Sequence, residues 1–125
     1  VTLSGEVRTL VEVLKDREVT ADASLVGGQV VLESSEGQIS ALLPNGASKA
    51  LYLDERLRDR PAEVTAWKHP GLPFLEVVSF RVEENGHLRT PEYFCEICTI
   101  SVRFPQVCPC CQGPMELRYQ PAASE

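Results

Sequence analysis

All five cysteines of this 125-residue chain lie between Cys95 and Cys111. Four of them, Cys95, Cys98, Cys108 and Cys111, form two pairs with the spacing C-x2-C-x9-C-x2-C. Two residues between thiolates allow one tight turn to aim both sulfur atoms at a single ion, and four thiolates complete the tetrahedral shell of a structural zinc site. The spacing therefore predicts that these four cysteines bind one Zn²⁺ ion.

Other uses of the cysteines stay open at this point. Iron could occupy the same shell as an electron carrier, because thiolate ligands alone do not select the metal. Disulfides or a dithiol redox pair are a further alternative, although an odd number of cysteines leaves one thiol over. In the metal interpretation the extra thiol is Cys110, which we expect to be a bystander, or a replacement ligand if Cys111 or Cys108 turns away.

The segment that carries the cysteines is short and holds few large apolar side chains. About 40 residues follow Gly86. Their large apolar side chains are Leu88, Phe94, Ile97, Ile100, Val102, Phe104, Val107, Met115 and Leu117. A unit of this size usually needs a metal or disulfides to fold, and structural zinc contributes on the order of 10–16 kcal/mol in small peptides. We therefore expect the metal to have a structural role.

The preceding residues must position this segment, and their pattern is that of a small β protein. Residues 1–14 alternate between apolar and polar, which predicts one long half-buried strand with a bend at Gly5. Residues 15–28 lose the pattern and predict a loop. The apolar runs Val30–Leu32 and Ile39–Leu43 flank a polar stretch with a glycine, which indicates a hairpin.

A helix is expected over residues 47–59, where the apolar period changes. Its stripe consists of Ala50, Leu53 and Leu57. Asn45 or Ser48 could cap its start, Asp54 and Arg58 form an i,i+4 pair, and Pro61 limits its end.

Two more strands are predicted after the helix. Residues 63–68 place Val64 and Ala66 on one face, and we expect Trp67 to be a core residue. Residues 74–82 form the second strand, with a turn after it at Asn85–Gly86. The face assigned to this strand comprises Phe74, Val78, Phe80 and Val82.

The resulting order is three strands, a helix and two strands, which resembles the OB-fold, a five-stranded, partly open barrel. The resemblance covers residues 1–84. Residues 87–119 resemble a zinc ribbon of the rubredoxin-like kind, because Tyr93 precedes the first cysteine by two residues and Pro109 follows the third. Thr99 stands where the first knuckle of that family usually carries glycine, and Gln112 precedes Gly113 in the second. The fold class is thus mainly β, with residues 120–125 as a loose tail.

Charge and composition disfavour several classes of function. The formal charge of -6 disfavours nucleic acid, whose binding relies on lysine and arginine, and the chain has no apolar run long enough to span a membrane. The histidines, His69 and His87, fall in predicted exposed turns and build no catalytic arrangement. We therefore expect a non-enzymatic interaction or assembly module whose partner is another protein.

Two other functions remain as alternatives: a rubredoxin-like iron electron carrier, and a single-stranded nucleic-acid binder that uses the barrel face. The clustered thiols suit a reducing cytosol, but a metal-bound site would also survive export, so the compartment stays open. The oligomeric state stays open as well.

Overall fold

Nine strands carry most of the regular structure in residues 1–121, the part of the chain that the computed structural model describes. The elements are β1 (Thr2–Thr9), α1 (Leu10–Asp16), α2 (Ala23–Val26), β2 (Val30–Glu33), β3 (Ile39–Leu42), α3 (Lys49–Leu53), the 3-10 helix η1 (Glu55–Leu57), β4 (Pro61–Lys68), β5 (Phe74–Glu84), β6 (His87–Arg89), β7 (Pro91–Cys95), β8 (Ile100–Val102) and β9 (Glu116–Tyr119). The mainly β class predicted from the sequence is confirmed.

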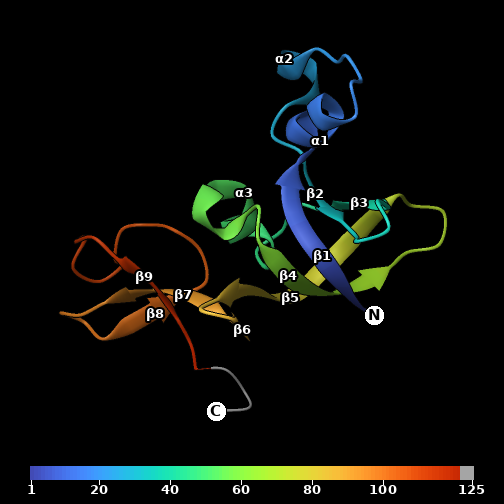
Figure 1. Ribbon diagram of the computed structural model, residues 1–125. Coiled ribbons are helices and arrows are strands. Elements are labelled where there is room, and N and C mark those ends of the chain that lie inside the picture. Colours follow the sequence, from blue (N-terminus) through green and yellow to red (C-terminus); the bar gives the residue numbers. More distant parts are fainter. Residues whose placement is uncertain (122–125) are drawn as a thin grey trace.

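The larger sheet curls into a nearly closed ring (Figure 1). Its strand order is β3-β2-β1-β4-β5-β6, and β3 also pairs with β5 in parallel, at Ala41 with Phe74 and Leu42 with Leu75. α3 and η1 lie between the third and fourth strands of the chain, as predicted. The remaining strands form a second sheet, in the order β8-β7-β9, which lies beside α3 and β6.

The strand predicted over residues 1–14 ends at Thr9, so its second half was wrong. The chain turns there into α1, which projects with α2 from one end of the ring (Figure 1). The Thr9 hydroxyl accepts a hydrogen bond from the Glu12 backbone N–H at 3.3 Å and donates one to the Glu12 carboxylate at 2.8 Å. A threonine followed three residues later by glutamate is a helix-start signal, and here it overrides the alternation that continues to Val13.

A bulge in β5 changes which of its side chains are buried. Thr65 pairs with Ser79 but Ala66 pairs with Val77, so Val78 is an extra residue on β5 and its side chain is exposed. A bulge reverses the inward and outward alternation of a strand. The face predicted to include Val78 was therefore wrong: the buried residues are Leu75 and Val77 before the bulge, and Phe80 and Val82 after it.

The predicted helix is shorter and is interrupted at Asp54, whose backbone is extended. The Asp54 carboxylate caps η1 by accepting the Arg56 backbone N–H and also binds the Arg56 guanidinium, so the expected pair with Arg58 is wrong. Before α3, the Asn45 and Ser48 side chains each accept the other's backbone N–H, at 2.9 and 3.0 Å.

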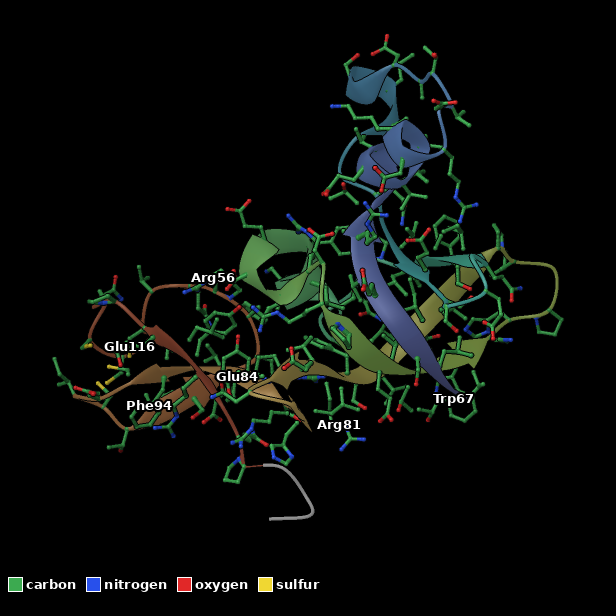
Figure 2. The ribbon with its side chains drawn as sticks, viewed as in Figure 1. Arg56, Trp67, Arg81, Glu84, Phe94 and Glu116 are labelled. Atoms are coloured by element: carbon green, nitrogen blue, oxygen red, sulfur yellow. The ribbon has the colours of Figure 1, made fainter. Side chains whose placement is uncertain are left out.

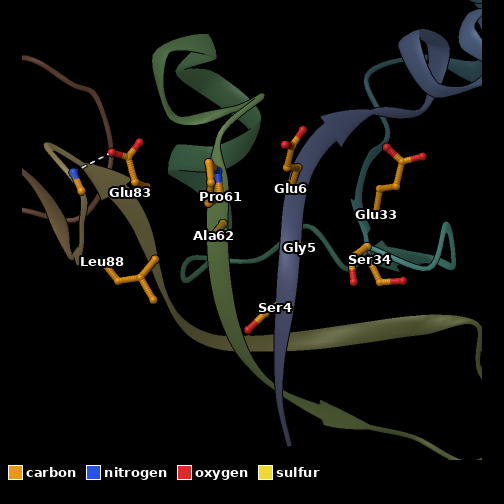
Figure 3. Close-up of a pocket in the computed structure, with 11 residues that line it drawn as sticks. Ser4, Gly5, Glu6, Glu33, Ser34, Pro61, Ala62, Glu83 and Leu88 are labelled. Atoms are coloured by element: carbon orange, nitrogen blue, oxygen red, sulfur yellow. Dashed lines mark hydrogen bonds between the residues drawn. The ribbon is translucent and has the colours of Figure 1, made fainter.

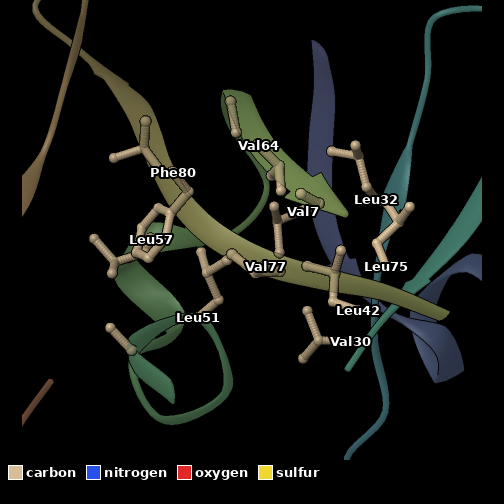
Figure 4. Close-up of a cluster of buried hydrophobic side chains, with 14 of the residues drawn as sticks. Val7, Val30, Leu32, Leu42, Leu51, Leu57, Val64, Leu75, Val77 and Phe80 are labelled. Carbon is tan, nitrogen blue, oxygen red and sulfur yellow. The ribbon is translucent and has the colours of Figure 1, made fainter. Parts of the chain in front are cut away.

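One apolar core fills the ring (Figure 4). The same core extends to the second sheet. The ring fills it with buried side chains from β1 to β5, α3 and η1, while Trp67 points outward from β4 and is exposed, contrary to prediction. The second sheet contributes Tyr93, which is 2% exposed. Its partly buried residues that pack on the same core are Val102, Phe104, Met115, Leu117 and Tyr119.

The structure also tests the predictions made for the hairpin, for the C-terminal tail and for membrane-spanning segments. Residues Val30–Leu42 form the predicted hairpin. Gln120, the first residue of the predicted loose tail, donates its backbone N–H to the Thr90 carbonyl at 2.9 Å, and residues 122–125 of that tail lie outside the described residues. Within residues 1–121, helices are too short to cross a membrane.

A buried hydrogen bond links the second sheet to Asp54, the residue between α3 and η1. The Tyr93 hydroxyl of β7 donates to the Asp54 carboxylate at 2.7 Å, and Asp54 is 6% exposed. Burial raises the pKa of Asp54, but hydrogen bonds from Arg56 and Tyr93 outweigh it and hold that pKa below its ordinary value. Ionised Asp54 therefore stabilises the fold at neutral pH, and this contribution is lost as the pH falls through the folded-state pKa.

We expect Tyr93→Phe to lower the free energy of unfolding by about 1.5–3 kcal/mol, because a buried carboxylate loses a hydrogen-bond donor while the ring still fills its place. Urea unfolding at pH 7 measures the loss. The difference from the parent protein should shrink in acid, where Asp54 is protonated. An unchanged stability at pH 7 would show that this bond does not contribute to the stability of the fold.

Candidate metal centre

The cysteines meet at the outer end of the second sheet. Cys95 is the last residue of β7 and Cys98 follows it in the turn to β8, while Cys108 and Cys111 lie in the connection from β8 to β9. The four sulfur atoms lie within 4.8 Å of one another, and Figure 2 shows sulfur (yellow) gathered beside Phe94 and Glu116. Four thiols at this separation could hold one metal ion, as the spacing predicts.

Distances inside the cluster suit coordination. The Sγ atoms of Cys95 and Cys111 are 3.6 Å apart, which is far longer than a disulfide bond of about 2.05 Å. A tetrahedral ion with bonds of about 2.3 Å to sulfur has sulfur–sulfur edges of about 3.8 Å. Cys95 and Cys108 are buried, Cys98 is half-buried and Cys111 is exposed, so the cluster has a protected inner side and an accessible outer side.

Backbone hydrogen bonds prepare Cys108 for metal binding. N–H groups of Cys111 and Cys110 point at its sulfur and lower the pKa of the Cys108 thiol to about 7, against the opposing effect of burial. The turn itself is closed by two bonds of 2.9 Å, from Gln112 N–H to the Cys108 carbonyl and from Cys108 N–H to the Gly113 carbonyl. Because the thiolate is the form that binds metals, this turn favours the ligating state.

The two cysteine turns share a backbone feature. Thr99 and Gln112, each the residue directly after the second cysteine of its pair, have left-handed backbones with φ of 54° and 63°. Glycine adopts this conformation freely, whereas a β-branched residue is strained in it. Thr99 and Gln112, where the sequence departs from the rubredoxin-like pattern, therefore stand at positions where glycine would fit best.

We expect Thr99→Gly to raise the free energy of unfolding by about 1 kcal/mol. Relief of left-handed strain contributes about 1–3 kcal/mol, and the greater flexibility of glycine in the unfolded chain offsets about 0.5–1 kcal/mol of it. Thermal unfolding of the metal-loaded protein measures the change. Thr99→Val keeps the branching and serves as the control, and a Thr99→Gly variant no more stable than this control would contradict the explanation.

A surface cavity of about 610 Å³ on the ring is a second candidate site. In Figure 3, Glu83 and Glu33 lie at opposite sides of this cavity, with Ala62, Gly5 and Glu6 between them. Glu33 is bound by two arginines of the β1–α1 region, and Glu83 accepts the Gly86 backbone N–H at 2.7 Å. These contacts give two of the three carboxylates roles within the fold.

The histidines lie apart from the thiol group. Both are exposed, as predicted, and His69 shares a hydrogen bond of 2.7 Å with Glu76. Among residues 1–121, the cluster of potential metal ligands consists of the four predicted cysteines. Comparisons with protein-family models, with curated proteins and with solved structures found no match to this chain.

Proposed function

We propose that this protein is a non-enzymatic interaction module in which one structural Zn²⁺ ion, bound by Cys95, Cys98, Cys108 and Cys111, organises a zinc ribbon on an OB-fold barrel. The observation that carries the proposal is the approach of the four sulfur atoms to within 4.8 Å. Four thiolates fill a tetrahedral shell, whereas a catalytic zinc keeps one position open for water or substrate.

The barrel assignment is supported by how the ring closes. β1 pairs with β2 through its second half and with β4 through its first half, and β3 meets β5 in parallel. With α3 between β3 and β4, this arrangement is similar to the OB-fold. Such barrels serve many functions, so the fold alone selects none.

A protein partner is supported by apolar side chains beside the thiol cluster. Ile97 lies inside the first cysteine pair and is 83% exposed, and Val107 directly precedes Cys108 and is 59% exposed. Exposed aliphatic residues held on a rigid turn suit contact with another protein. A pull-down from the native source should retain a partner on the parent protein and lose it on Ile97→Ser/Val107→Ser, with thermal stability unchanged in the variant.

The structural role of zinc is tested by removing the ion. A chelator should lower the melting temperature, and zinc should restore it, because a metal that binds only the folded chain stabilises it. An unchanged melting temperature after verified removal would refute this role.

An iron electron carrier is the first alternative, since the same four thiolates also bind iron. Ferric tetrathiolate absorbs visible light, and the zinc form is colourless. A colourless protein that contains zinc supports our proposal, and a coloured protein that contains iron supports the alternative.

Single-strand nucleic-acid binding by the barrel is the second alternative, and charge opposes it. The formal charge of -6 becomes about -8 with a zinc tetrathiolate. Three of the carboxylates counted in this charge line the cavity on the ring, and its lining residues include neither lysine nor arginine. A fluorescent oligonucleotide should therefore fail to bind even at low salt, and salt-sensitive binding would favour this alternative.

A further inference from the structure

A narrow cleft opens beside the thiol cluster. It has a volume of about 160 Å³ and lies between the end of β7, the two cysteine turns and the start of β9. Its walls include Phe94, Glu96, Ile97, Cys111, Pro114 and Glu116. An apolar cavity of about 150 Å³ holds one benzene molecule. The cleft is therefore large enough for a single apolar side chain.

The apolar walls of the cleft are side chains that the fold leaves accessible. Ile97, in the first cysteine turn, is 83% exposed. Pro114, which follows the second cysteine turn, is exposed as well, and Phe94 of β7 is half-buried. Removing such apolar surface from water favours binding, so an apolar side chain that enters the cleft gains from contact with these walls.

The rim of the cleft is acidic. Glu96 and Glu116 both line the cleft and both are exposed. Glu116 of β9 pairs with Phe94 of β7, and Figure 2 shows these two residues beside the sulfur atoms. A zinc tetrathiolate adds a formal charge of about -2 next to them. Negative charge therefore surrounds an apolar cleft.

Two arginines that are near the cleft in sequence are engaged with other groups. Arg103 donates a hydrogen bond to the Val78 carbonyl of β5 at 3.2 Å. Arg118 donates one to the Glu92 carboxylate at 2.7 Å, and its guanidinium lies over the Phe94 ring, 3.6 Å from the centroid. Among the residues that the structure describes, those that line the cleft include neither lysine nor arginine. The acidic rim is thus left for cations from another molecule.

We propose that the cleft binds a basic segment of a partner protein, which inserts one apolar side chain beside Ile97 and places lysines or arginines against Glu96 and Glu116. This inference rests on the proposed function, because the zinc ion orders the two turns and supplies part of the negative charge. The apolar contact provides affinity, and the opposite charges provide orientation and specificity. The partner is thereby narrowed to a protein that exposes a basic segment with an apolar residue in it.

The test is a two-dimensional amide NMR titration of the zinc-loaded full chain at low salt. The probe is a synthetic peptide in which one leucine is flanked on each side by two lysines. We expect it to shift the amide signals at the end of β7, in the two cysteine turns and at the start of β9. The shifts should shrink as salt is added, because salt screens exposed charges. Peptides with serine in place of leucine, or with glutamates in place of the lysines, should each bind at least about tenfold more weakly.

Charge variants of the chain locate the basic part of the contact. Glu96→Lys/Glu116→Lys should weaken binding of the lysine peptide at least about tenfold, because attraction becomes repulsion. Glu18→Lys/Glu36→Lys is the matched control, since it changes the net charge equally at two exposed positions of the first 84 residues. This control should bind the peptide within about twofold of the parent, because charges beyond a Debye length are screened.

An apolar pair of variants locates the leucine. Ile97→Ser should weaken binding about tenfold, because the cleft loses its most exposed apolar wall. Leu25→Ser removes a side chain that is 84% exposed on α2, and it should leave the affinity unchanged.

The outcomes separate this inference from the proposed function. A zinc-loaded chain that shows no shifts, shifts confined to the cavity on the ring, or equal affinity for the lysine and glutamate peptides would overturn the inference and leave the zinc site intact. Equal affinity of the parent and Ile97→Ser would do the same. A chain that binds no zinc would overturn the proposed function and this inference together.

Discussion

Replacement of Cys108 by serine is expected to abolish metal binding and to unfold the second sheet. Cys108 is completely buried, and its sulfur atom lies within 4.8 Å of the other three. Structural zinc contributes about 10–16 kcal/mol in small peptides, which is comparable to the entire stability of a domain. Hydrogen exchange should show the amides of β7, β8 and β9 losing protection, while those of β1 to β5 remain protected.

Cys110→Ser is the matched control for this experiment, because it removes a neighbouring thiol that lies outside the group of four. It should retain one metal ion per chain and full protection of the second sheet. If Cys108→Ser kept that sheet protected, packing on the barrel core would suffice to fold it and the structural role of the metal would be wrong.

Gly5→Ala should have the second largest effect, a loss of about 3 kcal/mol or more in the free energy of unfolding. Gly5 pairs with Ala62 of β4, and the next residue, Glu6, pairs with both Pro61 of β4 and Glu33 of β2. A Cβ atom there would lie 2.3 Å from the carbonyl oxygen of Glu33 and 3.2 Å from the Cα atom of Ser34. Overpacking usually costs about 1–3 kcal/mol, and here the obstacle is backbone, which cannot move aside as a side chain can.

Gly28→Ala is the control, since a Cβ atom at Gly28 meets nothing within 4 Å. Its stability should match that of the parent or exceed it by less than about 1 kcal/mol, because alanine restricts the unfolded chain. Urea unfolding of both variants measures the contrast. Equal free energies of unfolding for Gly5→Ala and Gly28→Ala would show that the fold does not require the close approach of β1 to β2 at Gly5.

Much of the strand order could be predicted because it depends on local patterns. The hairpin of β2 and β3 and the helix before β4 are marked by alternation, by turn residues and by a change of period. The bend expected at Gly5 stays a prediction, and it is the next residue, Glu6, that pairs with both β4 and β2.

The wrong predictions of strand length and burial arose where other features outweigh the alternation of apolar and polar residues. The hydrogen bonds between Thr9 and Glu12 start a helix where alternation continues. The bulge at Val78 depends on how β5 pairs with β4, which the sequence of β5 alone does not show. Trp67 follows the alternation of β4 correctly but faces outward, because aromatic character alone does not decide burial.

The cysteine cluster could be predicted because ligand spacing is a local property, but its surroundings could not. The bond from Tyr93 to Asp54 joins residues 39 positions apart, and no local pattern links them. The left-handed backbones at Thr99 and Gln112 had a signal in the sequence, since both stand at glycine-like positions of a cysteine turn.

The central claim is that Cys95, Cys98, Cys108 and Cys111 bind one zinc ion. Its most direct test is native mass spectrometry of the protein purified without added metal. We expect a mass equal to the chain plus one zinc ion, with all five cysteines reduced. A chain that carries no ion, with the sulfur atoms of Cys95, Cys98, Cys108 and Cys111 joined in disulfides, would contradict it.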